Sequence, residues 1–362
     1  MTKNFKERFL IPAFNTLLPV ISALFLGGII IFAIGDNPFK TYGVMISKSL
    51  FTVDGILKTL HFASPLILTG LAIAITFKAN VFNMGVEGQM LLGAFFSGVF
   101  GFSFDLPPLL HISLCLIVGV ITGILFALIP AFLKAFFKVN EMVVTLMLNY
   151  AAVEITRYLA QGVFRNPASG DVATYTINSS AMFNKVGKNI TAFFLISILV
   201  FIFIYILMKK SKLGYEITAI GKNEEFAKAS GMRVYRKIIY IMMISGGISG
   251  LAGAGWMMSE KYRYTTSFSG NPGIGWDGML IALLGAHNPV GVLIAAIFYA
   301  ALKTGSDYIN LYTNVPKDIV GVIQGILILF LSIKFINDKT DFLGRMRQRL
   351  KSIRGSKGAT RI

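Results

Sequence analysis

Apolar stretches of about 20 residues recur along the whole chain, and short polar segments separate them. A helix of that length crosses the hydrocarbon core of a membrane. The pattern predicts an all-α, polytopic membrane protein with about ten transmembrane helices, of which the eighth is short or re-entrant. The expected spans are residues 9–34, 56–77, 81–102, 109–133, 141–162, 190–208, 238–258, 277–286, 290–304 and 318–333.

The third expected span opens on a polar phrase, KANVFNMGVEGQMLLG, which covers residues 78–93. It holds Asn83, Glu87 and Gln89 within two helical turns. A carboxylate at membrane depth is costly unless a partner or a polar cavity satisfies it. These residues are therefore expected to line a substrate pathway. Two structural alternatives stand beside that hypothesis: interhelical hydrogen bonds for the two amides and capping of its own helix for Glu87.

The same kind of phrase returns late in the chain. Gly-Val-Glu-Gly at residues 85–88 is echoed by Gly-Trp-Asp-Gly at residues 275–278, and each opens an apolar run. In the expected topology the two phrases lie on oppositely directed segments, which is the arrangement of an inverted repeat with a site near the midplane. We expect two pseudo-symmetric inverted halves, about residues 56–163 and 238–335. Asp277 is thereby a second pathway residue, with capping of its own helix as the alternative.

Amide and aromatic side chains add to the expected pathway. Asn149 lies in the fifth span, and Trp276 stands directly before Asp277. Trp276 could stack on a nucleobase together with a cluster of nearby aromatic residues. The alternative is an aromatic belt at the membrane interface. The cluster consists of Tyr262, Tyr264 and Phe268.

Composition and charge agree with a membrane location. Only 14% of the residues are charged, against about 25% in soluble proteins. The formal net charge is +17, and with both termini inside the cell most of the Lys and Arg residues fall on the cytoplasmic side, as the positive-inside rule requires. The positive net charge is therefore explained without assuming that the protein binds nucleic acid. The basic tail, residues 336–362, is expected to lie beside anionic membrane lipids.

Several chemistries are excluded by what the sequence lacks. Cys115 is the one cysteine, so there is neither an intrachain disulfide nor a cysteine-rich metal site. His61, His111 and His287 are far apart, and we expect no metal. No HExxH or GxSxG motif points to an enzyme, and no G-x-x-x-x-G-K-[ST] loop is present to hold ATP. We expect no cofactor in this chain.

The longest charged segment between spans is residues 209–237. Small residues flank its centre and make a short helix with abrupt ends plausible, which could pass motion from a motor domain into the membrane. The candidate functional residues of this loop are Gly221, Asn223, Glu224, Glu225, Ala227 and Gly231.

Four blocks of the sequence carry a family resemblance. FNMGVEGQMLLGAF, residues 82–95, resembles the signature of permease subunits of ABC importers in the ribose and branched-chain amino acid permease family, and more narrowly its nucleoside-uptake branch, which takes up purine nucleosides. VNEMVVTLMLNY (139–150), GYEITAIGKNEEFAKASG (214–231) and GIGWDGMLIALLGAHNPVG (273–291) are similar to further blocks of that family. The resemblance covers about residues 66–329.

The resemblance implies a set of partners. Such a permease pairs with a second permease subunit, here a different chain, and a cytoplasmic ABC ATPase that binds ATP docks on the loop at residues 209–237. An extracellular substrate-binding lipoprotein delivers the nucleoside. The implied location is the bacterial cell membrane, with several passes and both termini cytoplasmic. The domains would be an N-terminal span with an external loop (1–55), the permease domain (56–335) and the tail (336–362).

Two other functions stay open at the level of the sequence. The same machine could import ribose-like sugars. An ion-coupled secondary transporter also uses inverted repeats and midplane carboxylates, and Glu87 or Asp277 would then carry the coupling ion.

Overall fold

The structure is a computed structural model. It describes residues 11–186, 189–269, 272–313, 315–316, 318–326 and 329–330. The first ten residues, the end of the expected permease domain and the basic tail at 336–362 lie outside the described residues.

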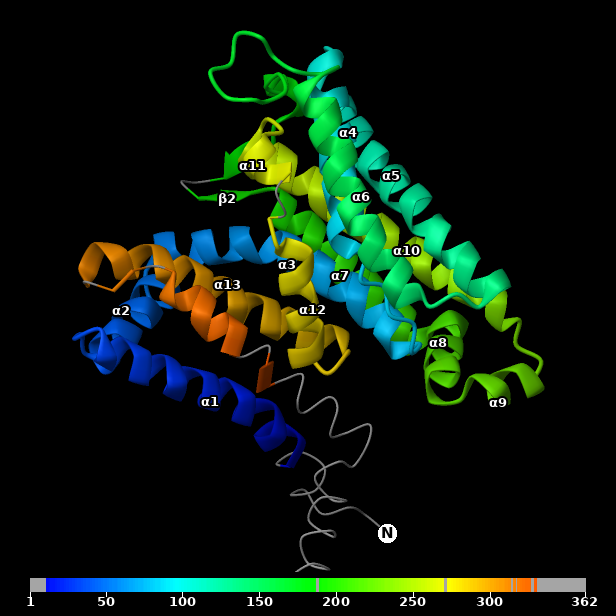
Figure 1. The fold of residues 1–362 in the computed structure, drawn as a ribbon, viewed down its shortest axis with the longest axis horizontal. Coiled ribbons are helices and arrows are strands. Elements are labelled where there is room, and N and C mark those ends of the chain that lie inside the picture. Colours follow the sequence, from blue (N-terminus) through cyan, green and yellow to red (C-terminus); the bar gives the residue numbers. More distant parts are fainter. Residues whose placement is uncertain are drawn as a thin grey trace, which may run out of the picture. The chain divides into compact units, whose positions relative to one another are not determined.

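Helices dominate the described residues (Figure 1). They are α1 (Ile11–Ala33), α2 (Pro38–Leu50), α3 (Val53–Lys78), α4 (Val86–Ser103), α5 (Pro108–Phe137), α6 (Glu141–Gln161), α7 (Phe193–Lys210), α8 (Lys212–Lys222), α9 (Glu224–Ala229), α10 (Val234–Trp256), α11 (Thr266–Ser269), α12 (Ile274–Leu284) and α13 (Pro289–Tyr312). Short 3-10 and π-helical turns follow at Ser179–Ala181 and Met257–Lys261. The helical prediction is confirmed. β structure in the described chain is limited to a short antiparallel ribbon, β1 (Lys185–Val186) with β2 (Ile190–Thr191), and two isolated bridges.

Five of the described helices are long and apolar enough to cross a membrane: α3, α5, α7, α10 with its π-helical extension, and α13. A sixth span is possible if α1 and α2, bent by 120° at a short break, count as one. The chain is thus a multi-pass helical protein. The count of ten spans stays a prediction.

Helix starts follow local capping chemistry. Thr52, Asn140, Ser211 and Asn223 each stand before a helix, and the side-chain oxygen of each accepts a backbone N–H group of the first turn. Such caps satisfy N–H groups that have no partner inside the helix. Asn223 has an extended backbone and divides the docking segment into α8 and α9. α9 lies between Gly221 and Gly231, where the sequence suggested a short helix with abrupt ends.

The described chain falls into two compact units: a larger one within residues 45–305, and a smaller one that combines residues 11–44 with the described residues from 306 to 330. In the larger unit α10 packs against α3, α4 and α5, and α12 packs against α3. The spans of α3 and α10 are mostly buried, whereas those of α5 and α7 are mostly exposed. Exposed apolar helices around a buried centre are what a membrane environment requires.

Glycines let the central helices approach closely. Gly246, Gly250 and Gly253 recur along the seventh expected span, where small residues predict close helix contacts, and all three lie on α10. A Cβ atom on Gly250 would collide with the carbonyl oxygen of Gly119 on α5, and one on Gly253 with that of Met90 on α4. The expected close contact of small residues is confirmed.

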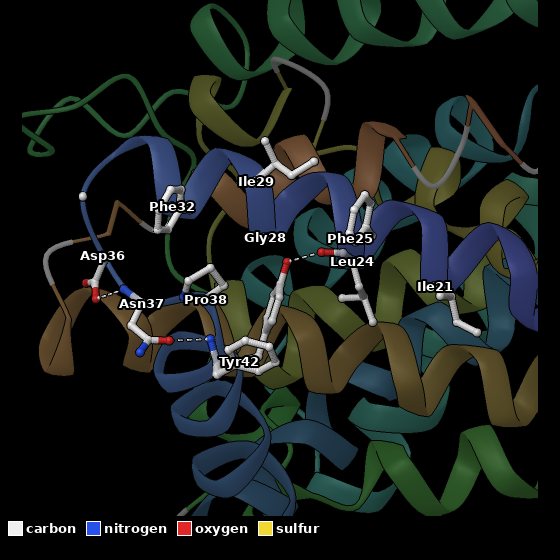
Figure 2. Close-up of a pocket in the computed structure, with 12 residues that line it drawn as sticks. Ile21, Leu24, Phe25, Gly28, Ile29, Phe32, Asp36, Asn37, Pro38 and Tyr42 are labelled. Carbon is white, nitrogen blue, oxygen red and sulfur yellow. Dashed lines mark hydrogen bonds between the residues drawn. The ribbon is translucent and has the colours of Figure 1, made fainter.

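The smaller unit contains α1 and the start of α2. Figure 2 shows an apolar cavity of about 990 Å³ beside the bend between them. The hydroxyl of Tyr42 donates to the carbonyl oxygen of Leu24 at 2.7 Å. The side chain of Asn37 accepts the N–H of Phe39 at 2.9 Å and starts α2. The expected external loop before residue 55 is therefore largely helix.

Candidate functional site

The polar phrase lies at a break between two helices. α3 ends at Lys78, and α4 begins at Val86. Asn80, inside the break, has a left-handed backbone with φ +58°. The N–H groups of the break and of the first turn of α4 need acceptors, because no preceding turn supplies them.

α6 supplies acceptors for the break from one face. Three of its side chains, spaced four residues apart, point to the same segment: Glu141, Thr145 and Asn149. In that order they accept the backbone N–H groups of Phe82 at 3.2 Å, Met84 at 3.1 Å and Gly88 at 2.9 Å. The amide of Asn149 also donates to the carbonyl oxygen of Met84 at 2.7 Å. We call these three residues the α6 ladder.

The two amides of the phrase bind each other. Asn83 donates to the side-chain oxygen of Gln89 at 3.1 Å and to the hydroxyl of Ser245 on α10 at 2.9 Å. Its own oxygen accepts the N–H of Gly85 at 3.0 Å. Both amides are almost fully buried. The hydrogen bond to another helix that the sequence suggested is therefore present for Asn83, whereas the Gln89 side chain bonds, among the described residues, to Asn83 alone. A pathway role for these residues stays a prediction.

Glu87 joins the two repeated phrases. It lies in the first turn of α4 and is 1% exposed. Its carboxylate accepts the N–H of Gly273 at 2.9 Å and the N–H of Gly275. A Cβ atom on Gly275 would stand 2.6 Å from the backbone nitrogen of Glu87, so the two helix starts touch. Glu87 therefore caps α12, and the idea that it caps its own helix is wrong.

Asp277 does not cap α12 either. Its carboxylate accepts a hydrogen bond from the hydroxyl of Tyr299 and lies 3.9 Å from the ammonium group of Lys303. Both partners are on α13. The Asp277 side chain is 20% exposed, and Trp276 beside it is half-buried. Tyr299 and Lys303 escaped the sequence analysis, although their spacing of four in an apolar run was the available signal.

The aromatic cluster after α10 is part of the packed interior. The rings of Tyr264 and Phe268 meet edge-on at 5.2 Å, and Tyr264 meets Phe95 of α4 at 5.0 Å. Both residues are buried. The expectation that they stack on a base or line the membrane interface is therefore wrong for these two. Tyr262 is half-buried.

The docking segment packs directly on the break. A Cβ atom on Gly221, near the end of α8, would collide with the carbonyl oxygen of Lys78 at the end of α3. A buried ion pair between Glu216 and Lys237, at 2.6 Å, ties α8 to α10. Figure 1 shows α8 and α9 together at one end of the larger unit. A displacement of α8 would therefore reach the residues that precede α4.

α9 presents a charged and aromatic surface. Lys228 forms ion pairs of 2.9 Å with Glu224 and Glu225, which raise the pKa of its ammonium group. Phe226 is 67% exposed, while Ala227 is fully buried and anchors the helix. Gly231, just after α9, has φ +81°, a conformation that favours glycine. Among the described residues no group of three His, Cys, Asp or Glu side chains could hold a metal ion.

Comparison with known proteins gives a consistent family assignment. The model of the permease component of branched-chain amino acid transport systems matches residues 55–332. The nucleoside ABC transporter permease protein NupB of Lactococcus lactis is 30% identical over 89% of this chain and 92% of the relative. The guanosine ABC transporter permease protein NupP of Bacillus subtilis is 31% identical over 89% and 95%. The glucose ABC transporter permease protein TsgB13 of Haloferax volcanii is 31% identical over 87% and 85%.

Proposed function

The chain belongs to the family of branched-chain amino acid transport system permease components, and on that premise we propose that it is the membrane subunit of an ATP-driven importer of nucleosides. As a member of an ABC transporter permease family it is a multi-pass membrane permease and not an enzyme. The family works with a separate ATPase and a substrate-binding partner. The further proposals concern the topology, the substrate and the route by which ATP acts.

For the topology we propose about ten spans, two inverted halves, both termini in the cytoplasm, and a second permease of different sequence beside this one. The inverted halves are supported by the meeting of the two repeated phrases at Glu87 and Gly275. Helix N-termini that abut near the membrane centre are typical of transporters with inverted repeats. α4 and α6, with 18 and 21 residues, would be spans whose buried polar side chains lower their hydropathy.

The contact of Gly221 with Lys78 is the observation that carries the mechanism. The chain has no phosphate-binding loop for ATP, so in an ATP-driven importer the ATP acts through a partner subunit. α8 and α9 expose charged and aromatic side chains, and α8 contacts the start of the α3–α4 break through Gly221. We propose that the ATPase docks on Asn223, Glu224 and Glu225 and moves α8 when it closes on ATP. The α3–α4 break and α4 would then move together with α8.

For the substrate, the similarity to NupB, a nucleoside permease, and to NupP, a guanosine permease, favours a nucleoside. We propose that Trp276 stacks on the base and that the carboxylate of Asp277 accepts hydrogen bonds from the ribose hydroxyl groups. Both are only partly buried, as a contact with a passing substrate requires. Asn83, Glu87, Gln89 and Asn149 would shape the wall of the pathway by holding the break and α12. The glucose permease of Haloferax volcanii, at similar identity, keeps a simple sugar as the second candidate.

Uptake into proteoliposomes tests this proposal. The vesicles would hold this chain with its partner permease and ATPase, and the binding protein and labelled guanosine would be added outside, with ATP inside or omitted. Uptake that needs ATP and is unaffected by excess ribose or glucose supports the nucleoside importer. Uptake that either sugar blocks would assign a sugar as the substrate and would still support the ABC mechanism. Uptake that follows an ion gradient without ATP contradicts the ABC mechanism.

A further inference from the structure

A basic pocket of about 340 Å³ lies beside α8, within the larger unit. It is bounded by the last residues of α3 and α7, the first two turns of α8, and the loop between α12 and α13. The lining residues that the argument uses are Lys78, Lys209, Tyr215, His287 and Asn288.

The charge of this pocket is unbalanced. Its lining contains two lysines, Lys78 and Lys209, and no carboxylate. Both lysines are exposed, and neither forms an ion pair with a described residue. Two neighbouring pockets are also basic, with four Lys and Arg side chains each, but both have carboxylates in their lining. In one pocket Glu224 and Glu225 pair with Lys228, and in the other Glu216 pairs with Lys237, so part of the positive charge there is already neutralised.

The backbone adds positive potential to the same pocket. α8 starts at its rim behind the cap residue Ser211, and α13 starts there with Pro289. The N-terminus of a helix carries partial positive charge and favours anions. A lysine in the last turn of a helix also stabilises that helix through its own dipole. A test must therefore separate a shared site from two independent helix ends.

We propose that this pocket binds a phosphate group, and that in the membrane the phosphate is that of an anionic phospholipid headgroup. The lysines stand where α3 and α7 leave the membrane, on the side proposed to be cytoplasmic, which is the level of the headgroups. Basic pockets between membrane helices on that side suit such lipids. The ammonium groups neutralise the phosphate, and the exposed Tyr215 hydroxyl and the Asn288 amide supply neutral polar groups. A bound headgroup would bridge α3, α7 and the α12–α13 loop beside the docking helices.

Direct binding tests the proposal without any transport step. The purified complex in a zwitterionic detergent would be titrated with short-chain phosphatidylglycerol, short-chain phosphatidylcholine and inorganic phosphate. The variant Lys78→Gln/Lys209→Gln would be compared with Lys210→Gln/Lys212→Gln, which removes the same charge from neighbouring positions outside this pocket. We expect phosphatidylglycerol to bind at least tenfold more weakly to the first variant and within twofold of wild type to the second. Phosphatidylcholine should not bind.

Each outcome either supports the phosphate site or overturns it. Equal weakening in both variants, or equal binding of the two lipids, would overturn the site and leave an ordinary basic membrane edge. Saturable binding of inorganic phosphate that Lys78→Gln/Lys209→Gln abolishes, without phosphatidylglycerol binding, would support the phosphate site and assign it to a soluble phosphate. Thermal unfolding of each variant verifies that it is folded. Because no nucleoside is involved, failure here leaves the proposed import function untouched.

Discussion

The carboxylate of Glu87 accepts the backbone N–H of Gly275, 188 positions further along the chain. This bond joins the starts of α4 and α12, the two helices that open on the repeated phrases. A carboxylate at a helix N-terminus satisfies free N–H groups and complements the helix dipole. The two halves of the sequence pattern are thus physically connected through one buried side chain.

Replacement of Glu87 should destabilise the protein in a graded way. Glu87→Ala leaves the N–H groups of Gly273 and Gly275 buried without an acceptor, at about 1–3 kcal/mol each. Glu87→Gln keeps one oxygen and should lose less. The midpoint of thermal unfolding in detergent, measured for both variants, should fall in the order wild type, Gln, Ala.

The exposed Glu225→Gln is the matched control, since its side chain is 83% exposed and its replacement should leave the unfolding midpoint of the isolated chain unchanged. Uptake separates the capping role from ion coupling. A Glu87→Gln protein with wild-type stability but no transport would contradict the capping role and favour a coupling carboxylate.

Gly221→Ala should impair coupling between ATP and transport. The added methyl group collides with the carbonyl oxygen of Lys78, and overpacking of this kind costs about 1–3 kcal/mol. α8 must shift away from the break, so both uptake and the stimulation of ATPase activity by substrate-loaded binding protein should fall together.

Gly43→Ala, on α2 and outside the docking loop, is the control for that experiment. Nothing lies within 4 Å of the new methyl group, and alanine favours a helix over glycine. We expect stability and coupling to be retained. Equal coupling defects in the two variants would contradict a specific role for the contact between α8 and α3.

The repeated phrases, their polar residues and the close-packed glycines of α10 could all be predicted, because each depends on local spacing. The helix that Glu87 caps could not be predicted, since its partner lies on a distant segment that only the tertiary fold brings near. Asn149 was selected alone, although Glu141 and Thr145 precede it at intervals of four and complete the α6 ladder.

Two boundaries were missed despite readable signals. Asn37 followed by Pro38 is a favourable start for a helix, since proline suits the first helical position, and α2 begins there. Asn223 followed by two glutamates is a cap with acidic residues in the first turn, and α9 begins there. Apolar periodicity does not reveal either start, because both helices are short and carry polar residues.

The α6 ladder gives a prediction that concerns the break alone. Asn149→Ala removes the acceptor for Gly88 and the donor to Met84, and loss of a cap costs about 0.5–2 kcal/mol. Tyr150→Phe, at the adjacent exposed position of α6, should be neutral. Hydrogen exchange measured by mass spectrometry should show faster exchange in residues 79–88 for the first variant only. Unchanged exchange there would contradict the ladder.

Glycine packing between α5 and α10 gives a matched pair. Gly250→Ala drives a methyl group into the backbone of Gly119 and should lower stability by about 1–3 kcal/mol. Gly98→Ala on α4 meets only the Met257 side chain, at 3.5 Å or more, and should be neutral or stabilising because alanine favours the helix. Thermal unfolding of the two variants tests the contrast, and a neutral Gly250→Ala would show that α5 and α10 are not in close contact.

Trp276 offers the most direct test of substrate recognition. It is half-buried next to Asp277, and stacking of a base on an aromatic ring contributes about 1–3 kcal/mol. Trp276→Ala should therefore raise the guanosine concentration for half-maximal uptake by about 5- to 150-fold, whereas Trp276→Phe keeps a stacking ring and should be affected much less. The affinity of the binding protein for guanosine and for the complex should not change, so the defect belongs to the membrane step. If both variants match wild type while Asp277→Asn still impairs uptake, the pathway recognises the sugar hydroxyls and not the base, which favours the simple-sugar assignment.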